Sequence, residues 1–163
     1  MRKIFFGLFF AYCALLVWIL LLSREADRSL GIAAYFAMHA NVYPYRTLIR
    51  YISYFAARRD RESLLLLLTN IGGNFLLFLP MGLFLPVLFS GMRRYSRCMA
   101  VVFAAILSAE LLQGVLRVGV PDIDDLTMNM MGALAGLPVT KNFSFAESSY
   151  HKTSLCRIHF CKK

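Results

Sequence analysis

A short stretch of the chain gathers side chains that could carry chemistry. It holds carboxylates, amides and one arginine, namely Glu110, Gln113, Arg117, Asp122, Asp124, Asp125 and Asn129. On insertion scales, a charged side chain at the centre of a membrane helix costs about 2.5 to 3.5 kcal/mol, so it needs a partner or a water-filled cavity. An ionised carboxylate such as Glu110 or Asp125 needs a cation, hydrogen-bond donors or water, and otherwise takes up a proton. We therefore expect the functional site in this stretch.

Several functions suit carboxylates beside amides, and the sequence leaves them open. We favour the binding of a polar group over catalysis. An intramembrane enzyme acting on an envelope lipid would use Glu110 or Asp125 as a general base, which needs a tuned pKa and reach to the proton. Oxygen ligands also suit Mg²⁺ or Ca²⁺, but no defined metal-binding loop is visible, and we predict no metal and no cofactor. In a purely structural interpretation, the polar groups bond helices together and Arg117 neutralises Glu110.

The composition places these residues in a membrane protein. Of the 163 residues, 59% are hydrophobic and only 17% are charged, and the mean hydropathy is +0.60, far from the balance of a soluble domain. The net charge of +9 does not indicate nucleic-acid binding, because the arginines lie close to apolar spans, where they fix orientation and bind anionic headgroups. The expected fold is all-α, an integral membrane bundle of transmembrane helices.

Four apolar segments predict the transmembrane helices, at about residues 4–22, 64–90, 98–117 and 122–140. Pro80 and Pro86 should kink the second helix, since a proline removes a hydrogen bond from the preceding turn. The fourth segment is short for a hydrocarbon core of about 30 Å, and we place its start near Pro121. Proline suits the first position of a helix, and acidic side chains there face the positive end of the helix dipole. The three aspartates after Pro121 should therefore form the first turn.

Basic residues set the predicted orientation. Those at the N-terminus, between the second and third segments and in the C-terminal tail fall on one side of a four-span bundle, and the positive-inside rule makes that side cytoplasmic. The first connection, Ser23 to Glu62, conflicts with this, because it carries seven arginines against four acids. A fifth span at Leu30 to Tyr45 would place those arginines inside. His39, Asn41 and Pro44 make that segment a poor span, and we prefer four spans with a cytoplasmic N-terminus.

In the four-span bundle, three sets of polar side chains meet at the outer membrane face. Each set lies on one helical face, because its members are three, four or seven positions apart. Together with Asp124 they form the predicted polar site: Asn70, Asn74, Glu110, Gln113, Asp122, Asp124, Asp125 and Asn129. The basic and aromatic segment Arg46 to Arg61 suits either the headgroup layer or a loop packed on the bundle.

Four blocks of residues resemble the VanZ-like family of small membrane proteins. They are Asn41 to Arg46, with the pattern Asn-x-x-Pro-aromatic-Arg; Asn70 to Asn74, followed by Phe78, Pro80, Gly82 and Pro86; Glu110 to Gln113; and Asp122 to Asn129, followed by Gly132 and Gly136. The resemblance covers about residues 41–137. It implies a four-helix membrane bundle and, as for the member that gives the family its name, lowered susceptibility to teicoplanin-type lipoglycopeptides.

The resemblance also sets the expected location, partners and domain limits. The location is the bacterial plasma membrane, and the partners are membrane lipids and a lipid-tailed or lipoglycopeptide ligand, with no nucleic acid. Residues 1–140 should form the VanZ-like domain, and residues 141–163 a polar, basic and disordered tail. The end of the domain departs from the family pattern. A typical member continues its last helix beyond the position of Gly136, whereas in this chain Pro138 cannot extend a regular helix.

Overall fold

The computed structural model describes residues 2–138, and within this range the chain forms helices and no strand. The named helices are α1 (Arg2–Val17), η1 (Trp18–Leu22), α2 (Ile32–His39), α3 (Arg46–Arg58), α4 (Arg61–Leu67), η2 (Leu68–Gly72), α5 (Gly73–Leu88), η3 (Ser90–Arg93) and α6 (Tyr95–Leu116). A final helix covers residues 123–138. The all-α fold expected from the composition is therefore confirmed.

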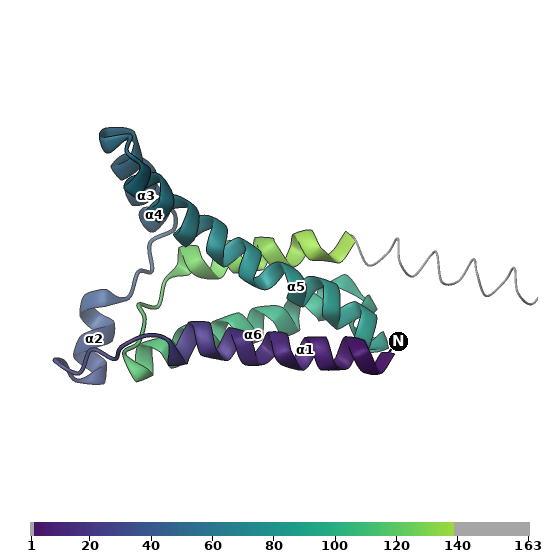
Figure 1. The fold of residues 1–163 in the computed structure, drawn as a ribbon. Helices are drawn as coiled ribbons and strands as arrows, with labels where there is room; N and C mark the ends of the chain where they lie inside the picture. The colour runs from purple at the N-terminus through teal and green to yellow at the C-terminus, as the bar shows by residue number, and fades with distance from the viewer. Residues whose placement is uncertain (1, 139–163) are drawn as a thin grey trace, which may run out of the picture.

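Four long helical stretches run alternately in opposite directions and form one bundle (Figure 1). They are α1 with η1, the continuous run from α4 through η2 to α5, then α6, and the final helix. The N-terminus and η3 lie at one end of the bundle. The other end, which we call the site end, holds α2, α3, the end of α6 and the start of the final helix.

Three of the helical stretches are long and apolar enough to cross a membrane, namely Arg2–Leu22, Arg61–Leu88 and Tyr95–Leu116. They overlap the first three predicted spans. The final helix is described only to residue 138, which gives it roughly 24 Å at 1.5 Å per residue. The end of the predicted fourth span and the predicted tail at 141–163 lie outside the described residues. The count of four spans and the cytoplasmic N-terminus remain predictions.

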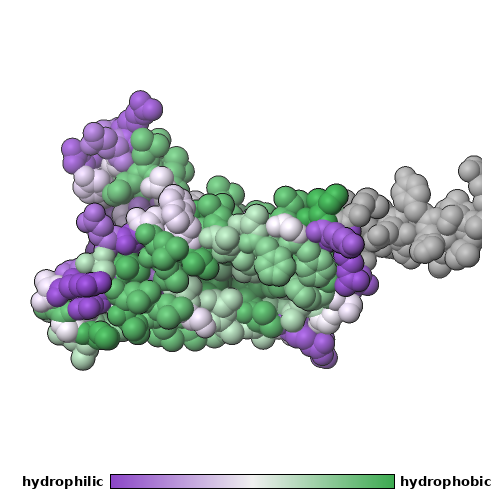
Figure 2. Space-filling model, turned by 60° about the horizontal axis from the view of Figure 1, so that its bottom comes forward, coloured by the Kyte–Doolittle hydropathy of each residue, from purple (hydrophilic) through white to green (hydrophobic). Residues whose placement is uncertain are grey.

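The bundle carries apolar side chains on its outside as well as in its core. The core is formed by Leu16, Leu20, Phe78, Met81, Leu85, Cys98, Val102, Ile106, Ala133 and Leu137. Large apolar residues such as Phe10, Leu76 and Leu134 are exposed. Figure 2 shows a broad hydrophobic region between hydrophilic ends. An exposed apolar surface of this extent is typical of a protein that faces lipid.

Glycines let the final helix approach α5 at van der Waals distance. A Cβ atom added to Gly132 would lie 1.9 Å from the carbonyl oxygen of Phe75, and one added to Gly136 would lie 2.3 Å from that of Leu79. On the other side of the contact, a Cβ at Gly82 would lie 1.9 Å from the carbonyl oxygen of Ala133. Gly132 and Gly136 are four residues apart, the small-xxx-small spacing that allows membrane helices to pack closely.

The second spanning stretch keeps both prolines inside the helix, as expected. Pro80 and Pro86 lie within α5. In the turn before Pro80, the carbonyl of Leu77 accepts a hydrogen bond of 2.7 Å from the Tyr12 hydroxyl of α1. A proline disturbs the hydrogen bonds of the turn before it, and this bond from Tyr12 ties that turn to α1.

The connection between the first and second spanning stretches is helical but contains no span. α2 has eight residues, about 12 Å of helix, which is too short to cross a hydrocarbon core of about 30 Å. This argues against the fifth span at Leu30 to Tyr45. α3 and α4 form a helical hairpin, turning at Arg59 in a left-handed conformation (φ 52°) and at Asp60, whose carboxylate caps α4 by accepting from the Ser63 amide.

Candidate functional site

The site is built where the start of the final helix meets the segment before α3. The backbone amide of Asn41 donates to the carbonyl of Pro121 at 2.9 Å, and the amide of Ile123 donates to the carbonyl of Asn41 at 3.1 Å. These two bonds form an isolated parallel bridge between Asn41 and Asp122. The bridge fixes two segments about eighty positions apart and places their side chains side by side.

Asp122 uses both carboxylate oxygens within this junction. Oδ1 accepts from the Asn41 side-chain amide at 2.9 Å and from the Asp124 backbone amide at 2.8 Å. Oδ2 accepts from the Thr47 hydroxyl at 2.5 Å. Since the helix begins at residue 123, Asp122 occupies the N-cap position and Asp124 the first turn, where a side-chain acceptor satisfies an amide that has no partner within the helix. Asp122 thus caps its own helix and also holds Asn41 and Thr47.

Asp124 caps a different helix. Its Oδ1 accepts from the Tyr45 amide at 2.6 Å, and its Oδ2 accepts from the amides of Thr47 at 2.8 Å and Leu48 at 3.3 Å. The residue at the N-cap of α3, Tyr45, has a left-handed backbone (φ 65°) and makes no capping bond with its own side chain. The start of α3 therefore receives its acceptor from the final helix, and the carboxylate of Asp124 lies at the positive end of the α3 dipole.

Two polar side chains of α6 connect its last turns to the same end of the bundle. Glu110 accepts a hydrogen bond of 3.2 Å from the Asp122 backbone amide. Gln113 donates to the carbonyl of Leu20 at 2.9 Å, within the irregular turn η1 that ends the first spanning stretch. Both side chains are buried. They join α6 to the final helix and to η1 respectively.

Arg117 does not neutralise Glu110. Its guanidinium donates to the carbonyl of Leu30 at 2.6 Å, and its Nε is buried without a partner. Between residues 2 and 138 the only ion pair is Arg58–Asp60, far along the chain from the carboxylates of the site. The pairing of Arg117 with Glu110, which the structural interpretation offered, is therefore absent from the described residues. α6 ends at Arg117 in a left-handed conformation (φ 58°), which turns this side chain toward the segment before α2.

Asp125 differs from the two preceding aspartates because it lines a small pocket. The pocket lies between α3, η2 and the final helix, and its lining is both polar and apolar: Thr47, Leu48, Tyr51, Asn70, Ile71, Asp124, Asp125 and Met128. The Asn74 side chain lies close to the Asp125 carboxylate. We call this opening the Asp125 pocket. Its wall combines a half-buried carboxylate, a phenol and an amide with three aliphatic side chains.

The structure divides the predicted polar site into two groups. Glu110, Asp122 and Asp124 belong to one hydrogen-bonded junction, whereas Asn70 and Asp125 line the pocket and Asn74 lies close to Asp125. Asn70 also donates to the carbonyl of Leu66 in its own helix at 2.8 Å.

Two predicted residues fall outside these groups. Gln113 bonds Leu20 instead of another predicted residue. Asn129 is only 2% exposed, and its side-chain oxygen has no partner among the described residues.

Sequence reasoning missed three contributors to the site. Asn41 was noted only as a residue that weakens the possible fifth span and as the start of a family block, Tyr51 only as part of the basic and aromatic segment, and Thr47 was not singled out. Asn41 carried a signal, because it begins one of the four blocks. Thr47 and Tyr51 carried none, since a hydroxyl in an amphipathic helix is ordinary.

The described carboxylates do not form a metal centre. Within residues 2–138, no three His, Cys, Asp or Glu side chains gather where they could hold a metal ion. The carboxylate oxygens of Asp122 and Asp124 are already used by amide and hydroxyl donors. The tail also contains two histidines and two cysteines, residue types that can ligate a metal, but their spacing matches no standard zinc pattern and they lie outside the described part of the chain: His151, Cys156, His159 and Cys161.

Three apolar helices of spanning length, with a polar junction at one end of an all-α bundle, define a multi-pass membrane protein. The family model described as VanZ/LLP1 matches residues 9–144. The chain belongs to the VanZ/LLP1 family, as the four sequence blocks indicated. No curated protein and no solved structure matches the chain.

Proposed function

We propose that this protein acts in the bacterial plasma membrane as a VanZ-like envelope protein that lowers susceptibility to teicoplanin-type lipoglycopeptides. It does so by binding a membrane-anchored or lipid-tailed ligand in the Asp125 pocket, which faces outward in the four-span orientation. The protein is a binding protein in this proposal, and no reaction is assigned to it.

The lining of the Asp125 pocket is the observation that carries this proposal. Asp125, Tyr51 and Asn70 offer a carboxylate, a hydroxyl and an amide to a polar group, while Leu48, Ile71 and Met128 offer aliphatic surface. Ligand sites in proteins combine a mostly apolar wall with a few polar groups that orient the ligand. The enclosed space is small, so the pocket would take a polar group of the lipid-tailed ligand, and the lipid tail would lie outside it along the apolar surface of the bundle.

The bonding of the neighbouring carboxylates supports Asp125 as the residue that contacts ligand. Asp124 accepts hydrogen bonds from three backbone amides at the start of α3. Asp122 accepts three further hydrogen bonds, one of them from the Thr47 hydroxyl of α3. Both carboxylates therefore hold α3 in place. Asp125 makes no ion pair within residues 2–138. A carboxylate at the wall of a pocket that makes no ion pair among the described residues is suited to accept hydrogen bonds from a ligand or to pair with its positive charge.

Teicoplanin susceptibility in a sensitive host tests the proposal. The host expresses the parent chain, the Asp125→Asn variant, or the Glu62→Gln control, which makes the same chemical change at an exposed carboxylate of α4. Membrane levels of the three proteins are matched by immunoblot. We expect the parent and Glu62→Gln to raise the inhibitory concentration of teicoplanin and Asp125→Asn to lose that effect. Equal protection by Asp125→Asn, or no protection by the parent, contradicts the proposal.

A further inference from the structure

α3 packs on the bundle through one side only. The half-buried residues of this helix are Thr47, Leu48, Tyr51 and Phe55. They lie on one helical face, because they are separated by one, three and four positions. This face contacts α4 and lines the Asp125 pocket, and the Asp124 carboxylate fixes its first turn. The position of α3 on the site end is therefore determined, and its other sides are uncovered by protein.

The uncovered part of α3 is itself amphipathic. Ile49 is 60% exposed and Ile52 is 48% exposed, and their i,i+3 spacing places them next to each other. Arg46 and Arg50 are exposed as well, and at 100° per residue they lie on the neighbouring side of the helix, with Ser53 about 20° from Arg46. Within residues 2–138 these isoleucines and arginines stay exposed, so no other helix covers this part of α3.

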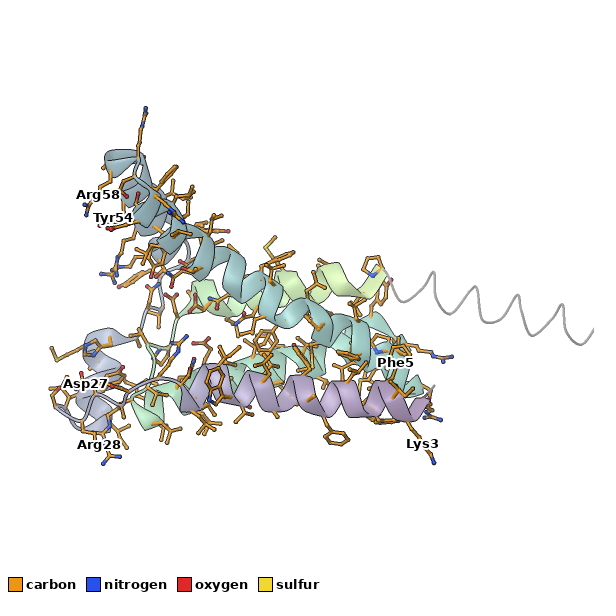
Figure 3. The ribbon with its side chains drawn as sticks, in the orientation of Figure 1. Lys3, Phe5, Asp27, Arg28, Tyr54 and Arg58 are labelled. Atoms are coloured by element: carbon orange, nitrogen blue, oxygen red, sulfur yellow. The ribbon has the colours of Figure 1, made fainter. Side chains whose placement is uncertain are left out.

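Aromatic rings accompany the arginines at both ends of α3. The Arg46 guanidinium lies 6.0 Å from the ring centre of Tyr43, which is exposed. The Arg58 guanidinium lies 5.4 Å from the ring centre of Tyr54 and donates to the Tyr54 hydroxyl at 2.6 Å. Figure 3 shows these two side chains together at the outer part of the hairpin. Tyrosines are enriched where a membrane protein meets the headgroup layer, because the ring is apolar and the hydroxyl is polar.

The hairpin lies where one spanning stretch leaves the membrane. α3 is joined through Arg59 and Asp60 to the stretch Arg61–Leu88, so its residues are confined to the level of that membrane surface. From residue 42 to residue 61 the chain carries five arginines and one acid, and that acid, Asp60, is paired with Arg58. Figure 2 shows this lobe with hydrophilic residues at its outer end and hydrophobic residues on its flank.

We propose that α3 is an interfacial helix that binds the anionic phospholipid headgroups of the leaflet at the site end. Arg46 and Arg50 contact the lipid phosphates, and Ile49 and Ile52 enter the upper acyl chains. Amphipathic helices with basic residues on the polar side bind membranes in this way. The surface is separate from the Asp125 pocket, so this inference and the proposed function stand or fall independently.

Tryptophan fluorescence in bilayers of known composition tests the depth of each side of α3. The chain has one tryptophan, Trp18, so the full-length Trp18→Phe protein serves as the background. Ile52→Trp reports the isoleucine side and Ser53→Trp, one residue later, reports the arginine side. The proteins are placed in nanodiscs of phosphatidylcholine brominated in the acyl chains, with or without phosphatidylglycerol.

The inference predicts that bromine quenches Ile52→Trp more strongly than Ser53→Trp, and that phosphatidylglycerol increases the quenching of Ile52→Trp. Equal quenching of the two tryptophans shows that α3 does not lie with its isoleucines toward the acyl chains, and overturns the inference. Quenching that does not depend on phosphatidylglycerol overturns the assignment to anionic headgroups. Circular dichroism of each variant in nanodiscs confirms that the helices are retained.

Lipid retention tests the arginines separately. Native mass spectrometry measures phosphatidylglycerol bound to the full chain and to the double variant Arg46→Gln with Arg50→Gln. An arginine near an anionic surface changes affinity by roughly fivefold, so we expect a clear loss of bound lipid in the double variant. The single variant Arg28→Gln, which alters an exposed arginine before α2, is the matched control. Unchanged retention in the double variant overturns the inference.

Discussion

At the scale of single residues, Asp124 acts as the N-terminal cap of a helix that lies almost eighty positions earlier in the chain. It accepts hydrogen bonds from the amides of Tyr45, Thr47 and Leu48. These are amides that an α-helix leaves without partners at its start, and Tyr45 offers no acceptor of its own. The consequence is that the position of α3 depends on one carboxylate of the final helix.

Removing that carboxylate should destabilise the protein. Loss of an N-cap acceptor costs about 0.5 to 2 kcal/mol, and here three amides lose their partner, so we expect Asp124→Ala to fall at the upper end of this range or above. Asp124→Asn keeps one side-chain oxygen and should lose less. The free energy of unfolding of each purified variant is measured in mild detergent micelles by titration with a denaturing detergent. The exposed Glu62→Gln variant should match the parent, and a parent-like Asp124→Ala would contradict the capping role.

Asp60 gives the turn between α3 and α4 a defined pH response. Hydrogen bonds from Ser63, together with the Arg58 guanidinium, hold the pKa of Asp60 below its usual 3.8. A carboxyl whose pKa is lower in the folded state adds stability above its unfolded pKa, and this is lost as the pH falls through the lower folded value. We expect the Ser63 amide to lose exchange protection in acid below pH 3.8. Hydrogen exchange of the Ser63 amide, corrected for the intrinsic pH dependence of amide exchange, measures this protection. The Asp60→Ala variant should show no change in corrected protection over this pH range.

At the scale of elements, the contact between α5 and the final helix depends on three glycines. At Gly82, Gly132 and Gly136, an added Cβ would come within 2.3 Å or less of a backbone carbonyl oxygen on the facing helix. A backbone carbonyl cannot move aside as a flexible side chain can, so the helices must separate to admit a side chain. Gly72 and Gly73 lie in the same helical stretch as Gly82, yet an added Cβ there would meet no atom within 4 Å.

Alanine substitutions should therefore distinguish the glycines at the helix contact from helical glycines that have free space around them. We expect Gly132→Ala to destabilise the bundle, with the cost of overpacking at about 1 to 3 kcal/mol. Gly72→Ala and Gly73→Ala should be neutral or stabilising by up to about 1 kcal/mol, because alanine is the better helix former. Detergent unfolding of the three variants checks the contrast. A stable Gly132→Ala protein would show that the two helices can move apart without cost.

At the scale of the whole molecule, the arrangement of the bundle brings the first connection and the polar junction to the same end. α3, the end of α6 and the start of the final helix all lie at the site end, and the N-terminus lies at the other (Figure 1). With Arg2–Leu22, Arg61–Leu88 and Tyr95–Leu116 each crossing the membrane once, these two ends face opposite sides. The side of the membrane that the Asp125 pocket faces follows directly from the side of the N-terminus.

Cysteine labelling should place the two ends on opposite sides. In a background in which the native cysteines are replaced by serine, Arg59→Cys puts a thiol at the tip of the α3–α4 hairpin and Gly91→Cys puts one in η3, both at exposed positions. With the N-terminus cytoplasmic, a membrane-impermeant maleimide should label Arg59→Cys in intact cells and Gly91→Cys only after permeabilisation. The opposite pattern would invert the orientation and place the Asp125 pocket on the cytoplasmic side.

The sequence by itself determined the helical framework and the residue types of the site. Runs of about twenty apolar residues have to become helices in lipid, because each backbone amide and carbonyl needs a partner within the segment. The start of the final helix just after Pro121 was also readable, since aspartate is favoured at helix starts for local reasons. Pro121, expected at the first helical position, lies instead before the N-cap residue Asp122. The local signals likewise indicated that Asp122, Asp124 and Asp125 would gather at one place.

Only the tertiary structure decided what each polar residue does. Nothing near Asp124 in the sequence indicates that it caps α3, and Arg117, which the structural interpretation paired with Glu110, donates to the carbonyl of Leu30 instead. The same holds for Asp125, whose place in a pocket wall depends on Tyr51 and Asn70 from two other helices. Spacing along one helix specifies which residues share a face, whereas the partner of a buried polar group is set by segments that meet only after the chain has folded.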